Sequence, residues 1–242
     1  MSENNTFIWI AGFSLLAALV NGLGIIAIFR FREWAEKAKP YFMCFAAGVL
    51  ISMPLTLALP DAIQYNFYAG FAALFGFLFM FISNRALKAL TKKETLAFGL
   101  TAAEGIGIHS FIDGIIYTVT FSVSLLTGIL AATGLVVHEF AEGIITYVVL
   151  IDGGVKKKIA MLYAFLIAAL TTPAGAFIAY PFIRKLNESS LGLMLGFVAG
   201  VLLYVSAAHL LPEARGEGKQ HSVLAFLAGM GLALFIVLTQ LL

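Results

Sequence analysis

Apolar residues run along this chain in long stretches that short polar segments separate. A helix needs about 20 apolar residues to cross the hydrocarbon core of a bilayer, and eight stretches come close to that length. Their approximate bounds are 7–29, 41–59, 65–84, 96–121, 125–151, 159–183, 191–211 and 223–242. Because the connections are short, the pattern predicts an all-α integral membrane protein, with eight transmembrane helices in a single domain over residues 1–242.

The composition agrees with this fold class. Hydrophobic residues make up 61% and charged residues 12% of the 242 residues, and the mean hydropathy is +0.99. Soluble domains average about 45–50% apolar and about 25% charged residues. One water-soluble globule could not bury this much apolar surface, so the expected partner is the lipid bilayer. The net charge of +2, without a long basic run, gives no indication of nucleic-acid binding. The lone cysteine, Cys44, excludes an internal disulfide and a thiolate cage for a metal.

Lysine and arginine gather in alternate connections of the predicted bundle. Of the 15 basic residues, only Arg184 and Lys185 lie in the other set of connections. The rest are Arg30, Arg32, Lys37, Lys39, Arg85, Lys88, Lys92, Lys93, Lys156, Lys157, Lys158, Arg215 and Lys219. Basic residues near the ends of spans stay on the cytoplasmic side. We therefore expect a multi-pass protein of the cell membrane with both termini outside the cytoplasm.

The second and seventh predicted spans share a sequence pattern. Each contains Ala-Gly-Val-Leu, from Ala47 and from Ala199, and each ends in Leu-Pro-Asp/Glu-Ala, from Leu59 and from Leu211. The two spans cross the membrane in opposite directions, and inverted repeats are typical of secondary transporters that hold their substrate near the midplane. The predicted layout is a 3+2+3 bundle: three spans, two central spans, then three spans. The alternative is that short apolar strings recur by chance.

The two central spans each carry a histidine and a carboxylate four residues apart. They are His109 and Asp113 on the fourth span, and His138 and Glu142 on the fifth. Residues at this spacing lie on one helix face. A tight turn near 122–124 lies midway between the two histidines, so they should lie at similar depths on antiparallel neighbours. Imidazole and carboxylate groups suit divalent first-row metals. The pattern predicts a metal site built from these four residues.

Further polar residues near the predicted site are weaker candidates for contact with the metal ion. Charged groups in a membrane cost about 3 kcal/mol each on an insertion scale, so buried ones usually mark a substrate path. Secondary candidates for the metal path are Ser110, Glu139, His209, Glu213 and Glu104. The alternatives are interhelical hydrogen bonding for Ser110, packing against a neighbouring helix for Glu139 and Glu104, and an interfacial hydrogen bond for His209.

At these residues the chain resembles the ZIP family of divalent-metal transporters. The usual family motifs are HNxPxG on span four and HExPxG on span five; here they read HSFIDG from His109 and HEFAEG from His138. Ile112 and Ala141 stand where the family carries prolines. Many bacterial members have a Glu-Pro pair on span six that helps to hold a second metal. Here span six has Thr172-Pro173, so we expect one main ion.

The resemblance implies transport of a divalent metal ion, above all zinc, into the cytoplasm, and it implies a homodimer. Fe²⁺, Mn²⁺, Co²⁺ or Cd²⁺ are further candidate substrates. No catalytic cofactor is expected, because the metal is the cargo. We expect alternating access, in which spans four and five move relative to the repeated halves. One alternative is an intramembrane zinc metalloprotease, since the His138–Glu142 turn (HEFAE) is similar to the HExxH motif but lacks its second histidine. Another is a metal-sensing or structural membrane protein without transport.

Overall fold

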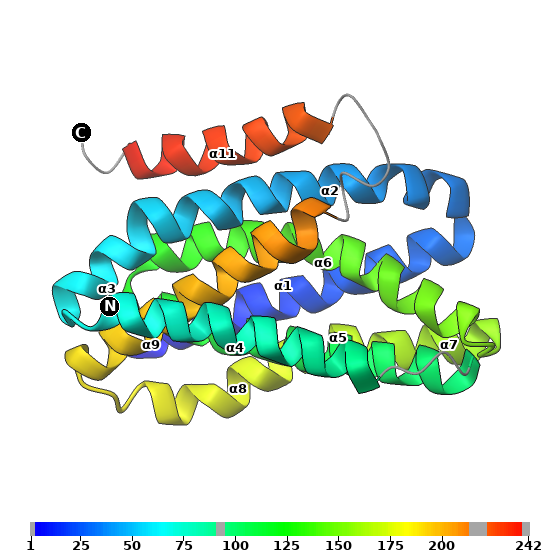
Figure 1. Cartoon of the computed structure of the whole chain (residues 1–242), viewed down its shortest axis with the longest axis horizontal. Coiled ribbons are helices and arrows are strands. Elements are labelled where there is room, and N and C mark those ends of the chain that lie inside the picture. The colour runs from blue at the N-terminus through cyan, green and yellow to red at the C-terminus, as the bar shows by residue number, and fades with distance from the viewer. Residues whose placement is uncertain (1–2, 91–94, 213–221, 239–242) are drawn as a thin grey trace.

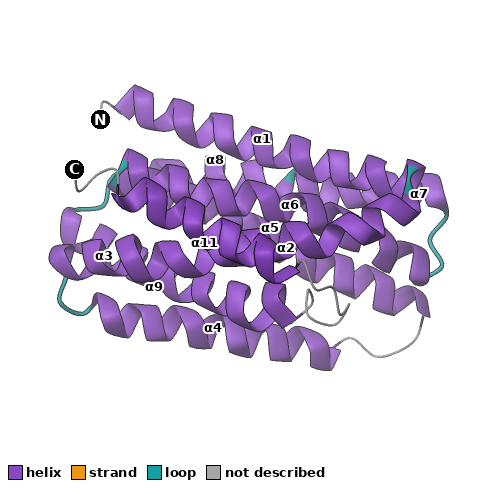
Figure 2. Ribbon diagram, turned by 90° about the horizontal axis from the view of Figure 1, so that it is seen from above, coloured by secondary structure: helices purple, strands orange, loops and turns teal. Residues whose placement is uncertain are grey.

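The fold consists of long helices joined by short connections. A computed structural model describes residues 3–90, 95–212 and 222–238, and it contains no strand in these ranges (Figure 2). Six of the described helical stretches are long and apolar enough to cross a membrane, and two further apolar helices are shorter. The protein is therefore an all-α membrane protein. The first residue of α1 and the last residue of α11 lie at the same end of the bundle (Figure 1).

The helices follow the predicted order. Their bounds are α1 (Glu3–Arg30), α2 (Arg32–Met53), η1 (Pro54–Ala58), α3 (Leu59–Tyr65), α4 (Ala69–Leu90), α5 (Thr95–Val123), α6 (Leu125–Asp152), α7 (Lys157–Ala164), η2 (Phe165–Ala169), α8 (Thr171–Ile183), α9 (Glu188–Tyr204), η3 (Val205–Leu210) and α11 (Ser222–Leu238). Residues 239–242, the end of the last predicted span, lie outside the described residues.

The second helix begins well before the predicted start at residue 41. The only break after α1 is at Phe31, and α2 starts at Arg32. The Arg32 Nε atom donates to Glu36 Oε1 at 2.8 Å, a side-chain pair one helical turn apart. Hydropathy does not register this polar first part of α2, because it is helical without being apolar. Three residues expected in a loop, Arg32, Lys37 and Lys39, therefore lie on a helix.

Three of the long helical stretches contain a π-helical turn, named η1, η2 and η3. Two of these turns come just before a repeated proline: η1 ends at Ala58, before Pro60, and η3 ends at Leu210, before Pro212. Proline has no N–H to donate to the preceding turn, and a wider turn is one way for a helix to accommodate this loss. By contrast, α5 and α6 are continuous α-helices.

The helices pack in two groups. α1 lies mainly against α6 and α5 against α8, while α4 lies mainly against α9 and α2 against α11 (Figure 1). α5 and α6 also pack on each other, and α2 joins the two groups by packing along α6. Glycine permits the closest approaches, because a Cβ atom added at Gly200 would overlap the Ala73 carbonyl oxygen of α4. This arrangement puts α5 and α6, with their histidines, inside the bundle.

Candidate metal centre

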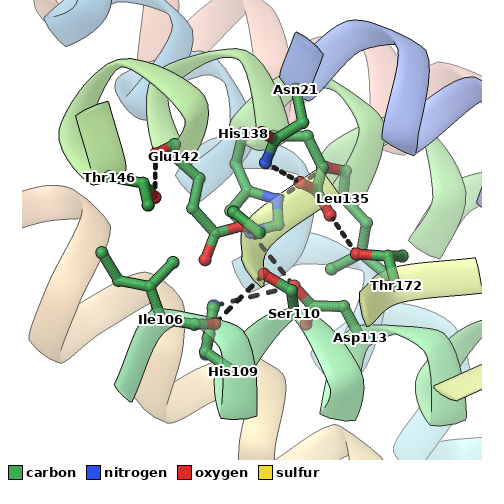
Figure 3. Close-up of polar contacts among 12 residues, drawn as sticks. Asn21, Ile106, His109, Ser110, Asp113, Leu135, His138, Glu142, Thr146 and Thr172 are labelled. Atoms are coloured by element: carbon green, nitrogen blue, oxygen red, sulfur yellow. Dashed lines mark hydrogen bonds and ion pairs between the residues drawn. The ribbon is translucent and has the colours of Figure 1, made fainter. Parts of the chain in front are cut away.

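A single residue, Ser124, separates α5 from α6. Its hydroxyl oxygen accepts a hydrogen bond from the Thr127 N–H at 3.0 Å and so caps α6. The chain reverses at this cap, and the two helices run back along each other. His109 and His138 therefore meet, with ring centroids 5.8 Å apart and ring planes at 89° (Figure 3).

Asp113 lies between the two histidines. Its Oδ2 atom is 3.3 Å from His138 Nε2 and 3.7 Å from His109 Nε2. Glu142 extends the cluster, since its Oε2 atom is 3.9 Å from His138 Nε2. Figure 3 shows the two residues of α6 facing the two residues of α5. The structure thus brings together all four residues that the sequence predicts as ligands.

Two overlapping sets of three side chains could each hold a metal ion. The first is His109, Asp113 and His138, and the second is Asp113, Glu139 and Glu142. Within each set the ligand atoms all lie within 4.8 Å of one another. Asp113 belongs to both sets, so a single ion near Asp113 can reach ligands from both helices.

The hydrogen bonding of His138 determines which of its nitrogens can bind a cation. Its Nδ1 atom lies 2.6 Å from the Leu135 carbonyl oxygen. A carbonyl only accepts, so Nδ1 carries the proton, and the neutral ring then has its lone pair on Nε2. Within the described part of the chain, His138 Nε2, Asp113 Oδ2 and Glu142 Oε2 have no hydrogen-bond partner. A cation held between these three electron-rich atoms, either a proton or a metal ion, would satisfy their lone pairs.

Burial raises the free-energy cost of leaving these groups without a cation. The exposed fraction is 1% for Asp113, 2% for His138 and 7% for Glu142. An ionised group in such surroundings is costly unless it is paired or binds a metal. A divalent ion between two carboxylates and two imidazoles offsets both negative charges and satisfies the free lone pairs. The arrangement is thus suited to divalent-ion binding.

Glu139 has a different environment from the other acidic residues. Its Oε2 atom accepts a hydrogen bond from the Asn21 amide of α1 at 2.7 Å, and its Oε1 atom accepts one from the Thr172 hydroxyl of α8 at 2.9 Å. Both carboxylate oxygens are thus engaged by side chains from other helices. Glu139 therefore contacts two neighbouring helices, and it also belongs to the second candidate metal set.

Of the remaining secondary candidates, Ser110 is the one whose side chain is described. The Ser110 hydroxyl donates to the Ile106 carbonyl oxygen of its own helix at 3.1 Å. Glu104 lies in α5 and His209 in η3, but neither side chain is among those described. Glu213 lies outside the described residues altogether.

Known proteins are similar to this chain in sequence. The profile of a family described as ZIP zinc transporters matches residues 92–237, more than half of the chain. The zinc transporter ZupT of Clostridium perfringens is 31% identical over 268 aligned positions, which cover 90% of each chain. ZupT of Chlorobium chlorochromatii is 30% identical, with 95% of this chain and 96% of that protein covered. The chain belongs to the ZIP family.

ZIP family membership makes the chain a divalent-metal transporter and not an enzyme, so the metalloprotease alternative is set aside. The two positions where the family usually carries proline, Ile112 and Ala141, lie in helices that run without a break.

Sequence reasoning did not predict the contacts of three buried polar residues of this ZIP protein near the histidines. Asn21 and Thr172 contact Glu139, and Tyr117 lies one turn beyond Asp113 on α5. All three have an exposed fraction of 0%. A signal was present for Asn21, which is an amide in the middle of an otherwise apolar stretch. Thr172 and Tyr117 are common in membrane helices, and their type alone does not single them out.

The Tyr117 hydroxyl leads to a stability prediction. It is buried and has no hydrogen-bond partner in the described part of the chain. A buried unsatisfied hydroxyl costs about 1–3 kcal/mol, so Tyr117→Phe should leave the melting temperature in detergent unchanged or higher. The matched control is Thr118→Val, because the Thr118 hydroxyl donates across helices to the Ala176 carbonyl oxygen at 3.1 Å. We expect the control to melt at a lower temperature; a lower value for Tyr117→Phe instead would mean that its hydroxyl has a partner.

Proposed function

We propose that this chain carries zinc across the cell membrane into the cytoplasm, and that the ion binds between α5 and α6 to His109, Asp113, His138 and Glu142. One observation carries the proposal: buried, electron-rich atoms of His138, Asp113 and Glu142 face one another without hydrogen-bond partners in the described structure. The ZupT relatives are zinc transporters by name.

The charges of this set match the cargo. Two carboxylates offset the charge of a divalent ion, and two neutral imidazoles replace part of its water shell. Two nitrogens and two oxygens suit the tetrahedral geometry of zinc. Fe²⁺, Mn²⁺, Co²⁺ and Cd²⁺ accept similar ligands, and raw affinity does not decide selectivity among them.

The proposed architecture is a single domain of eight spans in a 3+2+3 inverted repeat. The packing supports it, because each main helix pair has a counterpart: α1 with α6 corresponds to α8 with α5, and α2 with α11 to α9 with α4. A Cβ atom at Gly24 or Gly143 would overlap backbone across the first pair, and one at Gly175 or Gly114 would do so across the second. The two repeated Leu-Pro segments also follow π-helical turns at corresponding places.

The same packing supports a specific form of alternating access. α1, α5, α6 and α8 lie mainly against one another, while α2 with α11 and α4 with α9 form two pairs that meet through α3, η1 and η3. The first group contains the proposed metal ligands. We therefore extend the moving unit from α5 and α6 to include α1 and α8, and propose that it moves against the other group. The family resemblance further implies that two copies associate in the bilayer.

Transport is tested with the purified chain in proteoliposomes. We expect zinc uptake above that of empty liposomes, and competition by Fe²⁺, Mn²⁺, Co²⁺ or Cd²⁺ added in excess ranks the candidate ions. Binding of zinc without any flux would contradict the proposal and would favour the metal-sensing alternative.

The orientation follows from the basic residues. Among the described residues, Lys156, Lys157 and Lys158 lie at the end of the bundle opposite to Arg184 and Lys185. Lys92, Lys93, Arg215 and Lys219 lie outside the described residues. The positive-inside rule then places both termini outside the cytoplasm.

This topology predicts a labelling pattern. Lys185 and Lys157 are both exposed, and Cys44 is buried. We expect a membrane-impermeant maleimide to label Lys185→Cys in intact cells, and to label Lys157→Cys only after permeabilisation. Each variant serves as the control for the other. The reverse pattern would contradict the orientation.

A further inference from the structure

The Tyr117 hydroxyl is a buried polar group beside the proposed ion that packing does not explain. The side chain is fully buried on α5, and its oxygen has no hydrogen-bond partner among the described residues. The hydroxyls of the neighbouring Thr118 and Thr120 both donate to backbone carbonyl oxygens of their own helix. The rigid tyrosine ring holds its hydroxyl away from such carbonyls, and phenylalanine would fill the same space without the cost of a buried polar group.

Tyr117 faces the acidic part of the site. It lies four residues after Asp113, so both side chains lie on one face of α5. Side chains on a helix lean toward its N-terminus, which for Tyr117 is the direction of Asp113. The carboxylates of the second candidate metal set, Glu139, Asp113 and Glu142, all act electrostatically on this hydroxyl. The hydroxyl is therefore directed toward the groups that would surround an ion.

The candidate ions differ in what they need at this place. The two nitrogens and two oxygens of the proposed ligands complete the tetrahedron that zinc prefers. Mn²⁺ prefers octahedral coordination by oxygens, so at the same site it keeps part of its water shell. A buried water molecule needs about two to four polar partners. The ion, a carboxylate oxygen and the Tyr117 hydroxyl together supply that number.

We propose that Tyr117 is a specificity-determining residue of the ion site: its oxygen accepts a hydrogen bond from a water molecule that an octahedral ion such as Mn²⁺ keeps, while its O–H donates to a carboxylate of the second candidate metal set. Tyr117 thereby extends the range of ions that the site binds beyond tetrahedral zinc. This role rests on the proposed function. It adds a group between Asp113 and the turn at Ser124 that joins α5 to α6.

The test is Tyr117→Phe, which removes the hydroxyl and keeps the ring. In proteoliposomes we expect the ratio of Mn²⁺ uptake to zinc uptake to fall about tenfold, because one charge-assisted hydrogen bond is worth about that factor. Zinc affinity, measured by calorimetry in detergent, should change much less, since tetrahedral zinc keeps no water there. The matched control is Tyr204→Phe, a buried tyrosine of α9 whose ring packs against Phe77 and Phe81 of α4. Its uptake ratio should equal that of the wild type.

A spectroscopic measurement reports on the water without any transport. Bound Co²⁺ absorbs visible light much more strongly in a tetrahedral site than in one with more ligands, so its spectrum is diagnostic of geometry. We expect the absorption of bound Co²⁺ to rise in Tyr117→Phe as the water is lost, and to stay unchanged in Tyr204→Phe. Tyr117→Leu is a second variant should Tyr117→Phe not fold.

Several results would overturn the proposal. One is an unchanged ratio of Mn²⁺ to zinc uptake in a folded Tyr117→Phe protein, and another is an equal loss for both ions. A lower melting temperature with unchanged binding would also overturn it, because the hydroxyl would then only support the packing. So would a wild-type protein that binds zinc but no Mn²⁺. A wild-type protein that binds no zinc would instead refute the proposed function itself.

Discussion

His138→Ala is expected to reduce zinc uptake in proteoliposomes to the level of empty liposomes. His138 supplies a nitrogen whose lone pair is assigned by the hydrogen bond of its other nitrogen, since Nδ1 donates to the Leu135 carbonyl oxygen and Nε2 faces Asp113. Loss of a partner outside the ligand set typically costs 10–100-fold in metal affinity, and loss of a ligand itself should cost more. Radioactive zinc uptake over time, at several zinc concentrations, measures the effect.

The control for this variant is Thr133→Ala on the same helix. The Thr133 hydroxyl donates to the Ile129 carbonyl oxygen within α6, so its loss should leave uptake near the wild-type rate. Both variants must elute as folded, monodisperse protein for the comparison to count. Undiminished uptake by a folded His138→Ala protein would show that the ion takes another route.

Gly200→Ala should produce the largest loss of stability. The added Cβ atom would overlap the Ala73 carbonyl oxygen and lie 2.9 Å from the Phe77 nitrogen, and both of these atoms belong to the backbone of α4. A backbone cannot rotate aside as a flexible side chain can, so α4 and α9 must separate. Overpacking usually costs about 1–3 kcal/mol, and for a chain of this size 1 kcal/mol lowers the melting temperature by roughly 2–4 °C. We expect a decrease of about 5 °C or more by differential scanning fluorimetry.

Gly231→Ala is the matched control for this substitution. Gly231 lies on α11, and an added Cβ atom there has nothing within 4 Å among the described residues. Alanine also favours the helix more than glycine does, so the control should melt at the wild-type temperature or above. Equal melting temperatures for the two variants would show that α4 and α9 are not in close contact.

Much of the candidate site could be predicted from the sequence. The spacing of His109 with Asp113 and of His138 with Glu142 puts each pair on one helix face, because the α-helix has a known period. The tight turn at Ser124 then sets the depth of both pairs, and the structure brings the two faces together. Hydropathy likewise indicates where the apolar helices lie. What it does not register is a polar helical segment such as the start of α2 at Arg32.

The sequence by itself determined an all-helical chain, apolar enough for the membrane, with two histidine–carboxylate turns at matched depth, because these properties depend on composition and on local periodicity. Only the tertiary structure decided what surrounds the turns. Asn21 and Thr172 are far from Glu139 along the chain, and their hydrogen bonds exist only because α1 and α8 both pack beside α6. Which helices pack together depends on the fit of side chains and glycines across whole helix faces, and no local pattern in the chain contains that information.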